Sequence, residues 1–355
     1  MTPDRIYLDW NATAPLAAAA RAAVHHALDT VGNPSSIHTE GRQARAIVDQ
    51  ARQDLADAVG ADPMEVTFTS GATESAALTL AGRDLQSAAI EHDCISAWTH
   101  TTLSVDTVGR VTVPDPARSC LQAANGETGV LQTLPSGIAV SDATQAFGKI
   151  PLRAARDAAS QLLLSAHKIG GPKGVGAIVG QLDEDGHFRI RGGGQEFGRR
   201  SGTENIAGIA GFGAASRMAA AQVRDGIWQE LQALRDRLEV LLQEVAGTVV
   251  LIGAGPERLP NTTCFALPGW KGSTQVIEMD LAGYAISAGS ACASGKVAPS
   301  SALRAMRVPD EIAECSVRIS LGPGIIWPQL EAFATEWGRK SRRRVQEAGA
   351  AGASP

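Results

Sequence analysis

Cysteine is scarce in this chain of 355 residues, and no two cysteines form a Cys-x-x-Cys pair. Their number is odd and their spacing is wide, which argues against a disulfide framework and against a structural zinc site. We therefore predict a reduced protein in which most of the thiols are buried. The five cysteines are Cys94, Cys120, Cys264, Cys292 and Cys315.

Long apolar runs and an excess of basic residues are also missing. No run approaches the roughly 18 apolar residues that a membrane span requires, and residues 1–5 lack the pattern of a secretory signal. The 32 basic and 37 acidic side chains give a net charge of −5, which argues against a nucleic-acid surface over the whole protein. These absences predict a cytoplasmic protein that binds neither membranes nor nucleic acids.

The residues that are abundant indicate a folded protein with a large core. Hydrophobic residues make up 44% of the chain and charged residues 19%, a balance that argues against global disorder. At roughly 150 residues per domain, the length indicates about two domains. The 38 glycines are an enrichment, which indicates many tight turns or sites lined by backbone.

Amphipathic segments alternate with short apolar runs along most of the chain. Residues 39–59 are a predicted helix that Gly60 and Pro63 end. Several apolar runs are continuous, as expected for strands that are buried on both faces. The alternation favours an α/β domain with a mainly parallel sheet. The predicted strands are 66–69, 88–90, 138–140, 162–164, 175–179 and 249–252.

The last third of the chain indicates a second, smaller unit. Apolar residues at steps of three and four predict a helix at about 225–245, with Asp225 as its N-cap and Gly247 as its stop. Shorter predicted strands follow at 262–265, 285–287 and 316–319. We predict a large domain at 13–224, a small α+β domain from 1–12 and 225–346, and a flexible tail at 347–355.

Two turns that follow predicted strands carry residues suited to cofactor chemistry. In Ser70–Glu74, backbone N–H groups and the Thr73 hydroxyl suit a phosphate, although the alternative is only a turn with a helix cap. Lys168 follows the apolar run 162–164, where a buried ammonium group is costly without a purpose. Its amine could form a Schiff base with an aldehyde, or its side chain could extend to the surface.

A carboxylate and a thiol complete this set. Asp142 follows the predicted strand 138–140, and strand ends on one side of an open α/β sheet share a ligand crevice. Asp142 could pair with the ring nitrogen of pyridoxal phosphate or cap a helix. Cys292 lies among the small residues of Ser287–Gly295, which predicts an exposed thiol on a flexible loop, reactive if its pKa is lowered.

Together with further motifs, these features make the chain resemble the cysteine desulfurases, in the class V aminotransferase group of fold-type I pyridoxal-phosphate enzymes. The resemblance runs from Tyr7 to about Gly322. It implies the fold of that group, an α/β large domain with a mainly parallel sheet and a smaller α+β domain. The matching segments are Gly32–His38, Thr69–Ser75, Glu91–His92, Glu127–Gly129, Asp142–Gln145, Ser165–Lys168, Gly171–Gly174, Gly192–Glu196, Arg200–Thr203, Ser290–Cys292 and Val317–Ser320.

The resemblance implies that pyridoxal 5′-phosphate is the cofactor. Lys168 would hold it covalently, Asp142 would pair with its ring nitrogen, and Gln145 would donate to its phenolate oxygen. His92 would stack on the ring and act as an acid and base near the substrate sulfur. The implied phosphate ligands are Ala72, Thr73, Ser165, His167 and, across a homodimer with shared active sites, Thr203.

The implied substrate is L-cysteine. Arg318 would bind its carboxylate in a bidentate manner, and Asn33 and Asn125 would lie near it. Lys168 would remove the α-proton, and the Cys292 thiolate would attack the substrate sulfur to form a persulfide and release alanine. The persulfide would pass to an acceptor such as an iron–sulfur scaffold protein. No resident metal is implied, and Cys292 would contact a nascent iron–sulfur cluster only transiently.

Two further hypotheses stay open. A selenocysteine lyase or another class V enzyme shares the cofactor residues, and product analysis would separate it from a desulfurase. A degenerate fold kept as a binding subunit is conceivable because Gly126 stands where relatives usually have asparagine. Phe197, at a position that is commonly arginine, is a further departure. These departures leave Lys168, Asp142, His92 and Cys292 untouched.

Overall fold

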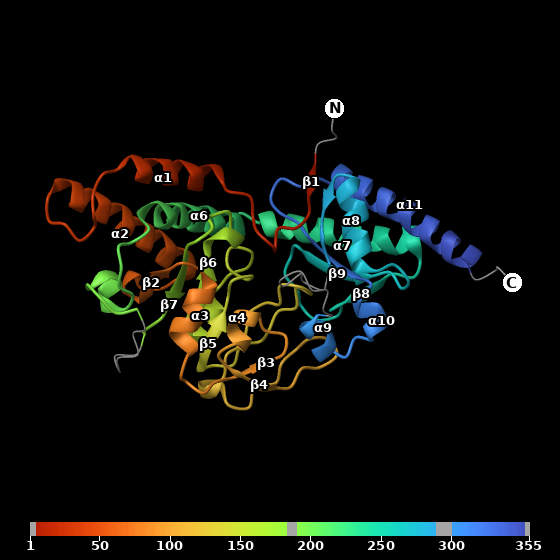
Figure 1. Ribbon diagram of the computed structural model, residues 1–355, viewed down its shortest axis with the longest axis horizontal. Helices are drawn as coiled ribbons and strands as arrows, with labels where there is room; N and C mark the ends of the chain where they lie inside the picture. The colour runs from red at the N-terminus through yellow and green to blue at the C-terminus, as the bar shows by residue number, and fades with distance from the viewer. Residues whose placement is uncertain (1–4, 183–189, 289–299, 352–355) are drawn as a thin grey trace.

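The computed structural model describes residues 5–182, 190–288 and 300–351. Cys292 therefore lies outside the described residues. Figure 1 shows two lobes side by side, one built mainly from the chain up to α6 and the other containing α7, α8 and α11. Among the described helices, none combines the length and apolar character that a bilayer crossing requires. The bounds of these helices are α6 (Ile206–Arg224), α7 (Ile227–Ala246), α8 (Gly272–Leu281) and α11 (Trp327–Ala351).

The larger lobe is built on a sheet whose order is β2-β7-β6-β5. β5 and β6 are parallel, and β7 is antiparallel to both of its neighbours, so β2, β6 and β5 point the same way. Parallel bridges from Val140 to Cys120 and from Ser119 to Gln86 join this sheet to the parallel pair β3–β4. The predicted mainly parallel sheet is confirmed, with β7 as the exception. The strands are β2 (Val66–Thr69), β3 (Gln86–Ala88), β4 (His100–Leu103), β5 (Ile138–Asp142), β6 (Ala159–Ser165) and β7 (Gly176–Val179).

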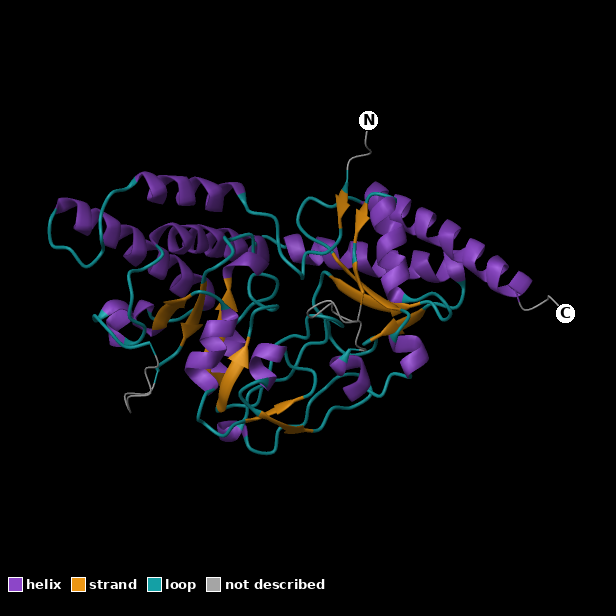
Figure 2. Cartoon of the chain, in the orientation of Figure 1, coloured by secondary structure: helices purple, strands orange, loops and turns teal. Residues whose placement is uncertain are grey.

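Helices cover both faces of this sheet (Figure 2). Successive side chains of a strand point to opposite faces, and β6 shows the consequence. Leu162 and Leu164 pack in one core cluster with residues of α2 and α6, whereas Leu163 packs in another with residues of α3 and α4. A strand buried on both sides has no polar face, which explains its continuous apolar run. The helices of this lobe are α1 (Ala18–Asp29), α2 (Thr39–Val59), α3 (Ala72–Leu80), α4 (Asp93–Ser96) and α5 (Arg153–Ala158).

The smaller lobe is built on an antiparallel sheet of order β11-β12-β9-β8. Its core contains Phe265 edge-to-face with Trp337 and Trp270 stacked on the same indole. The N-terminal strand β1 pairs with β10, and Asp9 bridges to Ser320, so the start of the chain joins this lobe. The remaining elements are β1 (Ile6–Tyr7), β8 (Val250–Ile252), β9 (Thr262–Ala266), β10 (Tyr284–Ala285), β11 (Ser287–Ala288), β12 (Ser316–Ser320), α9 (Ser301–Ala305) and α10 (Asp310–Ala313).

The helix boundaries were predicted with mixed success. The helix at 39–59 is confirmed, and Gly60 ends it in the left-handed region with φ 72°. Gly247 likewise ends α7. The prediction of Asp225 as the N-cap of α7 is wrong, because Asp225 is the C-terminal cap of α6 and the left-handed Gly226 separates the two helices. α11 continues to Ala351, into the predicted tail, because its alanines favour helix.

Two strand predictions also need correction. The strand expected at 88–90 is β3 at Gln86–Ala88, two residues earlier. The strand expected at 285–287 is two short strands, because β10 pairs with β1 and β11 pairs with β12, and Ile286 lies between them. These segments pair only over two or three residues, so an apolar pattern alone does not fix their ends.

Candidate active site

The carboxyl ends of three strands of the large sheet meet at one edge. Because β2, β5 and β6 point the same way, the residues that follow them lie on one side of the sheet. β2 leads into the turn at Ser70, β5 ends at Asp142, and β6 leads into a short 3-10 turn that ends at Lys168. The structure thus brings together three segments that are well separated in the sequence.

Lys168 points its amine at the N-terminal segment of the chain. Its Nζ atom donates to the carbonyl oxygen of Asn11 at 2.6 Å and to that of Ala12 at 3.0 Å. Burial, with a smaller contribution from the positive charge of Arg318, lowers the pKa of Lys168 to about 8, against an opposing effect of Asp142. A larger fraction of this amine is therefore neutral, and nucleophilic, near neutral pH than for an ordinary lysine.

Asp142 is buried, and its Oδ1 atom accepts a hydrogen bond from the Thr144 N–H at 2.9 Å. A second acid, Glu91, is also buried and accepts a hydrogen bond from the Gln122 N–H at 2.8 Å. Burial, and to a lesser degree the charge of Asp142, raises the pKa of Glu91 well above its usual range. The raised pKa favours the protonated form of Glu91, and its causes show that Glu91 and Asp142 influence each other electrostatically.

Four of the five predicted phosphate ligands, Ala72, Thr73, Ser165 and His167, lie at this edge. Ala72 and Thr73 begin α3, which has no side-chain cap, so the first N–H groups of the helix are left for another acceptor. Ser165 is buried at the end of β6. The Nδ1 atom of His167 lies 3.1 Å from the Thr13 hydroxyl. Burial and the charge of Lys168 lower the pKa of His167 to about 4, so this ring is neutral.

His92 is exposed at the start of α4. Its Nδ1 atom accepts a hydrogen bond from the Cys94 N–H at 3.1 Å and lies 3.1 Å from the Cys94 thiol. Sequence reasoning grouped Cys94 with the buried thiols and missed its place beside His92 and Thr73. Burial and the nearby charge of Asp142 raise the pKa of Cys94 to about 12. Cys94 is thus a protonated thiol at the edge of the site.

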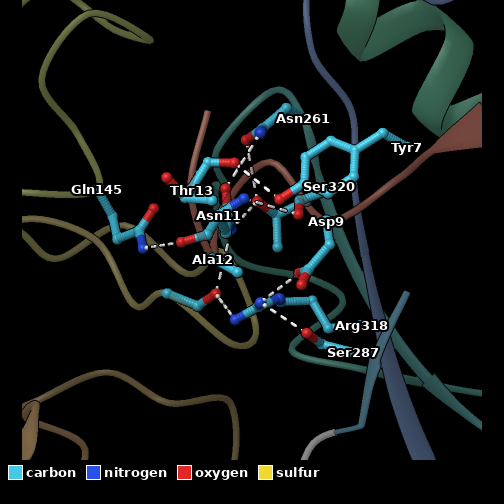
Figure 3. Close-up of polar contacts among 12 residues, drawn as sticks. Tyr7, Asp9, Asn11, Ala12, Thr13, Gln145, Asn261, Ser287, Arg318 and Ser320 are labelled. Carbon is cyan, nitrogen blue, oxygen red and sulfur yellow. Dashed lines mark hydrogen bonds and ion pairs between the residues drawn. The ribbon is translucent and has the colours of Figure 1, made fainter. Parts of the chain in front are cut away.

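Arg318, on β12, binds three groups (Figure 3). Its Nη2 atom donates to Asp9 Oδ1 at 2.7 Å and to the Ser287 hydroxyl at 3.2 Å, and its Nη1 atom donates to the Gly126 carbonyl at 3.1 Å. A Cβ atom at Gly126 would lie 3.2 Å from the Gln145 amide nitrogen. The glycine that departs from the family pattern therefore leaves room for Gln145.

Asn11 connects the two lobes at the floor of this site (Figure 3). Its side chain is 1% exposed and donates to the Gly126 carbonyl and to the Thr262 hydroxyl. Its amide oxygen accepts from Lys149 Nζ at 2.7 Å, and its carbonyl oxygen accepts from Gln145 Nε2 at 3.0 Å. Sequence reasoning missed both Asn11 and Lys149. The signal that could have found Lys149 was a lysine within the small and apolar segment Ala146–Ile150.

The other predicted site residues lie differently. Asn125 is buried, but its amide oxygen accepts from Glu127 and Thr128 and its nitrogen donates to the Ile90 carbonyl, so its side chain holds its own turn. Asn33 is exposed in the segment between α1 and α2, and Thr203 is exposed before α6. Among the described residues, no hydrogen bond joins Asn33 or Thr203 to Lys168.

A metal site requires several ligating side chains close together. Within residues 5–182, 190–288 and 300–351, no three His, Cys, Asp or Glu side chains gather as a metal site would require. Cys292, the predicted persulfide carrier, lies outside these ranges.

Comparisons with known proteins agree on one family. The family described as Aminotransferase class-V matches residues 6–101 and 93–325. The chain is 36% identical to the cysteine desulfurase IscS of Dictyoglomus turgidum over 358 residues, which cover 89% of each chain. It is 37% identical to a cysteine desulfurase of Bradyrhizobium diazoefficiens over 353 residues, also 89% of each chain.

Solved structures are similar over nearly the whole fold. A NifS-like protein from Rickettsia africae has a TM-score of 0.83 and 31% identity, covering 94% of this chain and 99% of that one. The structure of SspA in complex with cysteine has a TM-score of 0.75 and 26% identity, covering 90% of this chain and 100% of that one. The chain is an enzyme of the pyridoxal-phosphate-dependent class V aminotransferase family. Within that family it belongs to the cysteine desulfurases.

The residues present fit pyridoxal 5′-phosphate. The group needs an amine, an anion for its ring nitrogen and donors for its phosphate. The strand edge offers Lys168 with a lowered pKa, the buried Asp142 carboxylate, and the uncapped start of α3.

Proposed function

We propose that this chain removes sulfur from L-cysteine, releases L-alanine and carries the sulfur as a persulfide on Cys292. The observation that carries the proposal is the amine of Lys168, which has a pKa lowered to about 8 and shares a strand edge with the buried Asp142. Membership of the cysteine desulfurase family supports the reaction. The similarity to SspA, whose solved structure is a complex with cysteine, supports the substrate.

In this proposal the cofactor residues keep the roles that the family implies. When bound, pyridoxal phosphate supplies an aldehyde that condenses with amines and a ring that accepts electrons from the substrate α-carbon. Lys168 holds the group covalently, Asp142 keeps its ring nitrogen protonated, and Gln145 donates to its phenolate oxygen. The phosphate is held by Ala72, Thr73, Ser165 and His167.

The residues that we propose to act on the substrate begin with Arg318, on the small lobe. Arg318 binds the substrate carboxylate, since its guanidinium is already held by Asp9 and the Gly126 carbonyl and so loses little freedom on binding. Lys168 removes the α-proton, a task that suits an amine with a pKa near 8. His92 exchanges a proton with the substrate sulfur. We assign Asn125 a positioning role through the turn that it holds, rather than direct contact.

The persulfide step requires Cys292 to reach this site. The contacts that Ser287 and Ser300, on either side of Cys292 in the sequence, make near the site support this proposal. Ser287 accepts a hydrogen bond from Arg318, and Ser300 donates one to Glu127 at 2.5 Å. Cys292 is five residues from Ser287, so an extended chain limits the separation of their Cα atoms to about 18 Å. The thiolate attacks the substrate sulfur, the C–S bond breaks, and its electron pair stays on the carbon that becomes alanine.

Thr203 and Asn33 lead us to propose a homodimer. Both are exposed in the single chain, so the phosphate contact implied for Thr203 and the substrate contact implied for Asn33 would be made to the site of a partner subunit. We further propose that the enzyme acts in the cytoplasm and passes its sulfur to an acceptor such as an iron–sulfur scaffold protein.

The test is reconstitution with pyridoxal phosphate, followed by absorption spectra and alanine production from L-cysteine. The wild type should show a visible band and form alanine, and Lys168→Ala should lose both. Lys271→Ala is the matched control, because Lys271 is exposed and pairs only with Glu314 among the described residues. A colourless wild type, or a Lys168→Ala variant with full activity, would contradict the proposal.

A further inference from the structure

A second lysine, Lys149, lies beneath the candidate active site and is 2% exposed. Its Nζ atom donates to Gln145 Oε1 at 2.8 Å and to Asn11 Oδ1 at 2.7 Å. No carboxylate pairs with it within the described parts of the chain. A lysine buried without an acid is costly, so its retention in the core needs a reason.

The two groups that accept hydrogen bonds from Lys149 are uncharged amides. Burial first, and then the positive charges of Lys168 and Arg318, lowers the pKa of Lys149 well below its usual range. The Nζ atom donates to both amide oxygens, so the two contacts together fix its position.

This contact decides which way the Gln145 amide faces. Its oxygen accepts from Lys149, so its nitrogen must lie on the opposite side. There Nε2 donates to the Asn11 carbonyl, which also accepts from Lys168 Nζ. A flipped amide would place two acceptors against each other at the Asn11 carbonyl, and the amide oxygen would lose the hydrogen bond that Lys149 donates to it. The donor end of Gln145 therefore faces the reactive lysine.

We propose that Lys149 is a positioning residue that holds the Gln145 amide with its nitrogen toward Lys168, so that Gln145 donates to the phenolate oxygen of pyridoxal phosphate. The inference rests on the proposed function, because it concerns the same cofactor. Lys149 itself touches neither the cofactor nor the substrate. It acts through Gln145 and, by fixing the Asn11 side chain, through the segment that receives the Lys168 amine.

The test uses the reconstituted enzyme and its visible absorption band. The negative charge on the phenolate oxygen stabilises the proton on the neighbouring lysine nitrogen. A hydrogen bond donated to that oxygen reduces this charge and so lowers the pKa of the proton. Loss of the donor should therefore raise the pH midpoint of the band. We expect Lys149→Met to raise this midpoint by about half a unit to one unit. We expect it to weaken pyridoxal phosphate binding about five- to tenfold, the effect of one hydrogen bond.

A double-mutant cycle separates this role from simple destabilisation. Gln145→Leu should shift the midpoint in the same direction, and adding Lys149→Met to it should shift it no further. Phe147→Leu is the stability control, since Phe147 is buried against Phe212 in the core. It should lower the urea midpoint of unfolding and leave the band unchanged.

The outcomes separate the inference from the function on which it rests. An unchanged band midpoint in Lys149→Met, or additive shifts in the double variant, would overturn the inference about Lys149. The proposed function would still stand in that case, provided that the wild type forms the visible band. A wild type that forms no visible band with pyridoxal phosphate would overturn both.

Discussion

The carbonyl oxygen of Asn11 accepts a hydrogen bond from Lys168 Nζ at 2.6 Å, although the two residues are 157 positions apart. Asn11 belongs to the N-terminal segment, which is fixed to the small lobe through Ser320, whereas Lys168 follows a strand of the large sheet. The orientation of the reactive amine thus depends on the contact between the two lobes. A change in that contact would alter the site without touching the lysine.

The first prediction concerns the pH at which the apoenzyme captures pyridoxal phosphate. Only the neutral amine of Lys168 is nucleophilic, so the association rate should rise with pH around a midpoint of about 8. Arg318→Met should raise this midpoint, because Arg318 lowers the pKa of Lys168. Asp9→Asn should lower it, because Asp9 raises the same pKa. Stopped-flow absorbance across pH 6.5–10 is the measurement.

The control for this series is Arg304→Met, at an exposed arginine that lies near Asp310. It should leave the midpoint at the wild-type value. Shifts of the same sign in Arg318→Met and Asp9→Asn would contradict the electrostatic explanation, since the two side chains carry opposite charges.

Most of the fold, and the placement of the candidate cofactor residues at strand ends, could be predicted from the sequence because they depend on local patterns. A strand buried on both faces gives an apolar run, and its end fixes where the next residue lies. Asp142 and Lys168 were found in this way, from β5 and β6. Helix α6 was missed because it contains Gly208, Gly211 and Gly213, and glycine lowers helix propensity. Gly213 lets α6 approach α2, since a Cβ there would lie 2.6 Å from the Ala51 Cα atom.

The parts that could not be predicted depend on contacts between distant segments. Lys149 meets Asn11 only after the chain closes on itself, and a side-chain contact across 138 positions leaves no local pattern. The contacts of Cys94 with Thr73 and of Asn125 with the Ile90 carbonyl were missed for the same reason, because each joins segments that only tertiary structure brings together. The domain boundaries at 12/13 and 224/225 and the roles of Asn33 and Thr203 stay predictions.

The second prediction concerns a buried ion pair that supports the loop before α6. Arg52 and Glu196 form two hydrogen bonds of 2.8 Å, with side chains only 7% and 2% exposed, and Glu196 also accepts from the Phe68 N–H. Arg52→Met leaves the Glu196 carboxylate buried without its partner, and should lower the free energy of unfolding by about 3–5 kcal/mol. Urea unfolding is the measurement.

The control for the pair is the double variant Arg52→Met with Glu196→Gln. It removes both charges and should recover part of the loss, because the uncompensated charge is the main cost. If the loss of unfolding free energy in the double variant equals the sum of the losses in Arg52→Met and Glu196→Gln, the two side chains act independently and this explanation is contradicted.

The third prediction is a pH dependence of stability that arises from Glu127. Its Oε1 atom is buried without a partner among the described residues, and burial raises the pKa of Glu127 to about 7, although Ser300 and Arg318 oppose the shift. The folded state then binds more protons than the unfolded state between about pH 4.5 and pH 7. Stability should therefore fall as pH rises through this window, by at most about 1.4 kcal/mol per pH unit.

Glu127→Gln tests this directly, because it keeps the shape and removes the titration. Between pH 5 and pH 7 the unfolding free energy of the wild type should fall relative to that of the variant. Above pH 8 the difference between the two should stay constant. Parallel stability curves at all pH values would show that Glu127 does not titrate in this range.

The fourth prediction distinguishes two thiols and bears on the central claim. Cys94 lies beside His92 but has a pKa raised to about 12, so it is a poor nucleophile at neutral pH. Cys94→Ala should keep at least half of the wild-type rate, because it removes a thiol that does not react. Cys292→Ala should reduce sulfide release by at least a hundredfold.

The most direct measurement is the amount of alanine and sulfide formed from L-cysteine by the reconstituted wild type, Cys94→Ala and Cys292→Ala, with added pyridoxal phosphate and a reductant. We expect alanine and sulfide in equal amounts from wild type and from Cys94→Ala, and neither product in excess of background from Cys292→Ala. Alanine and sulfide from Cys292→Ala at the wild-type rate, or no alanine from the wild type, would contradict this expectation.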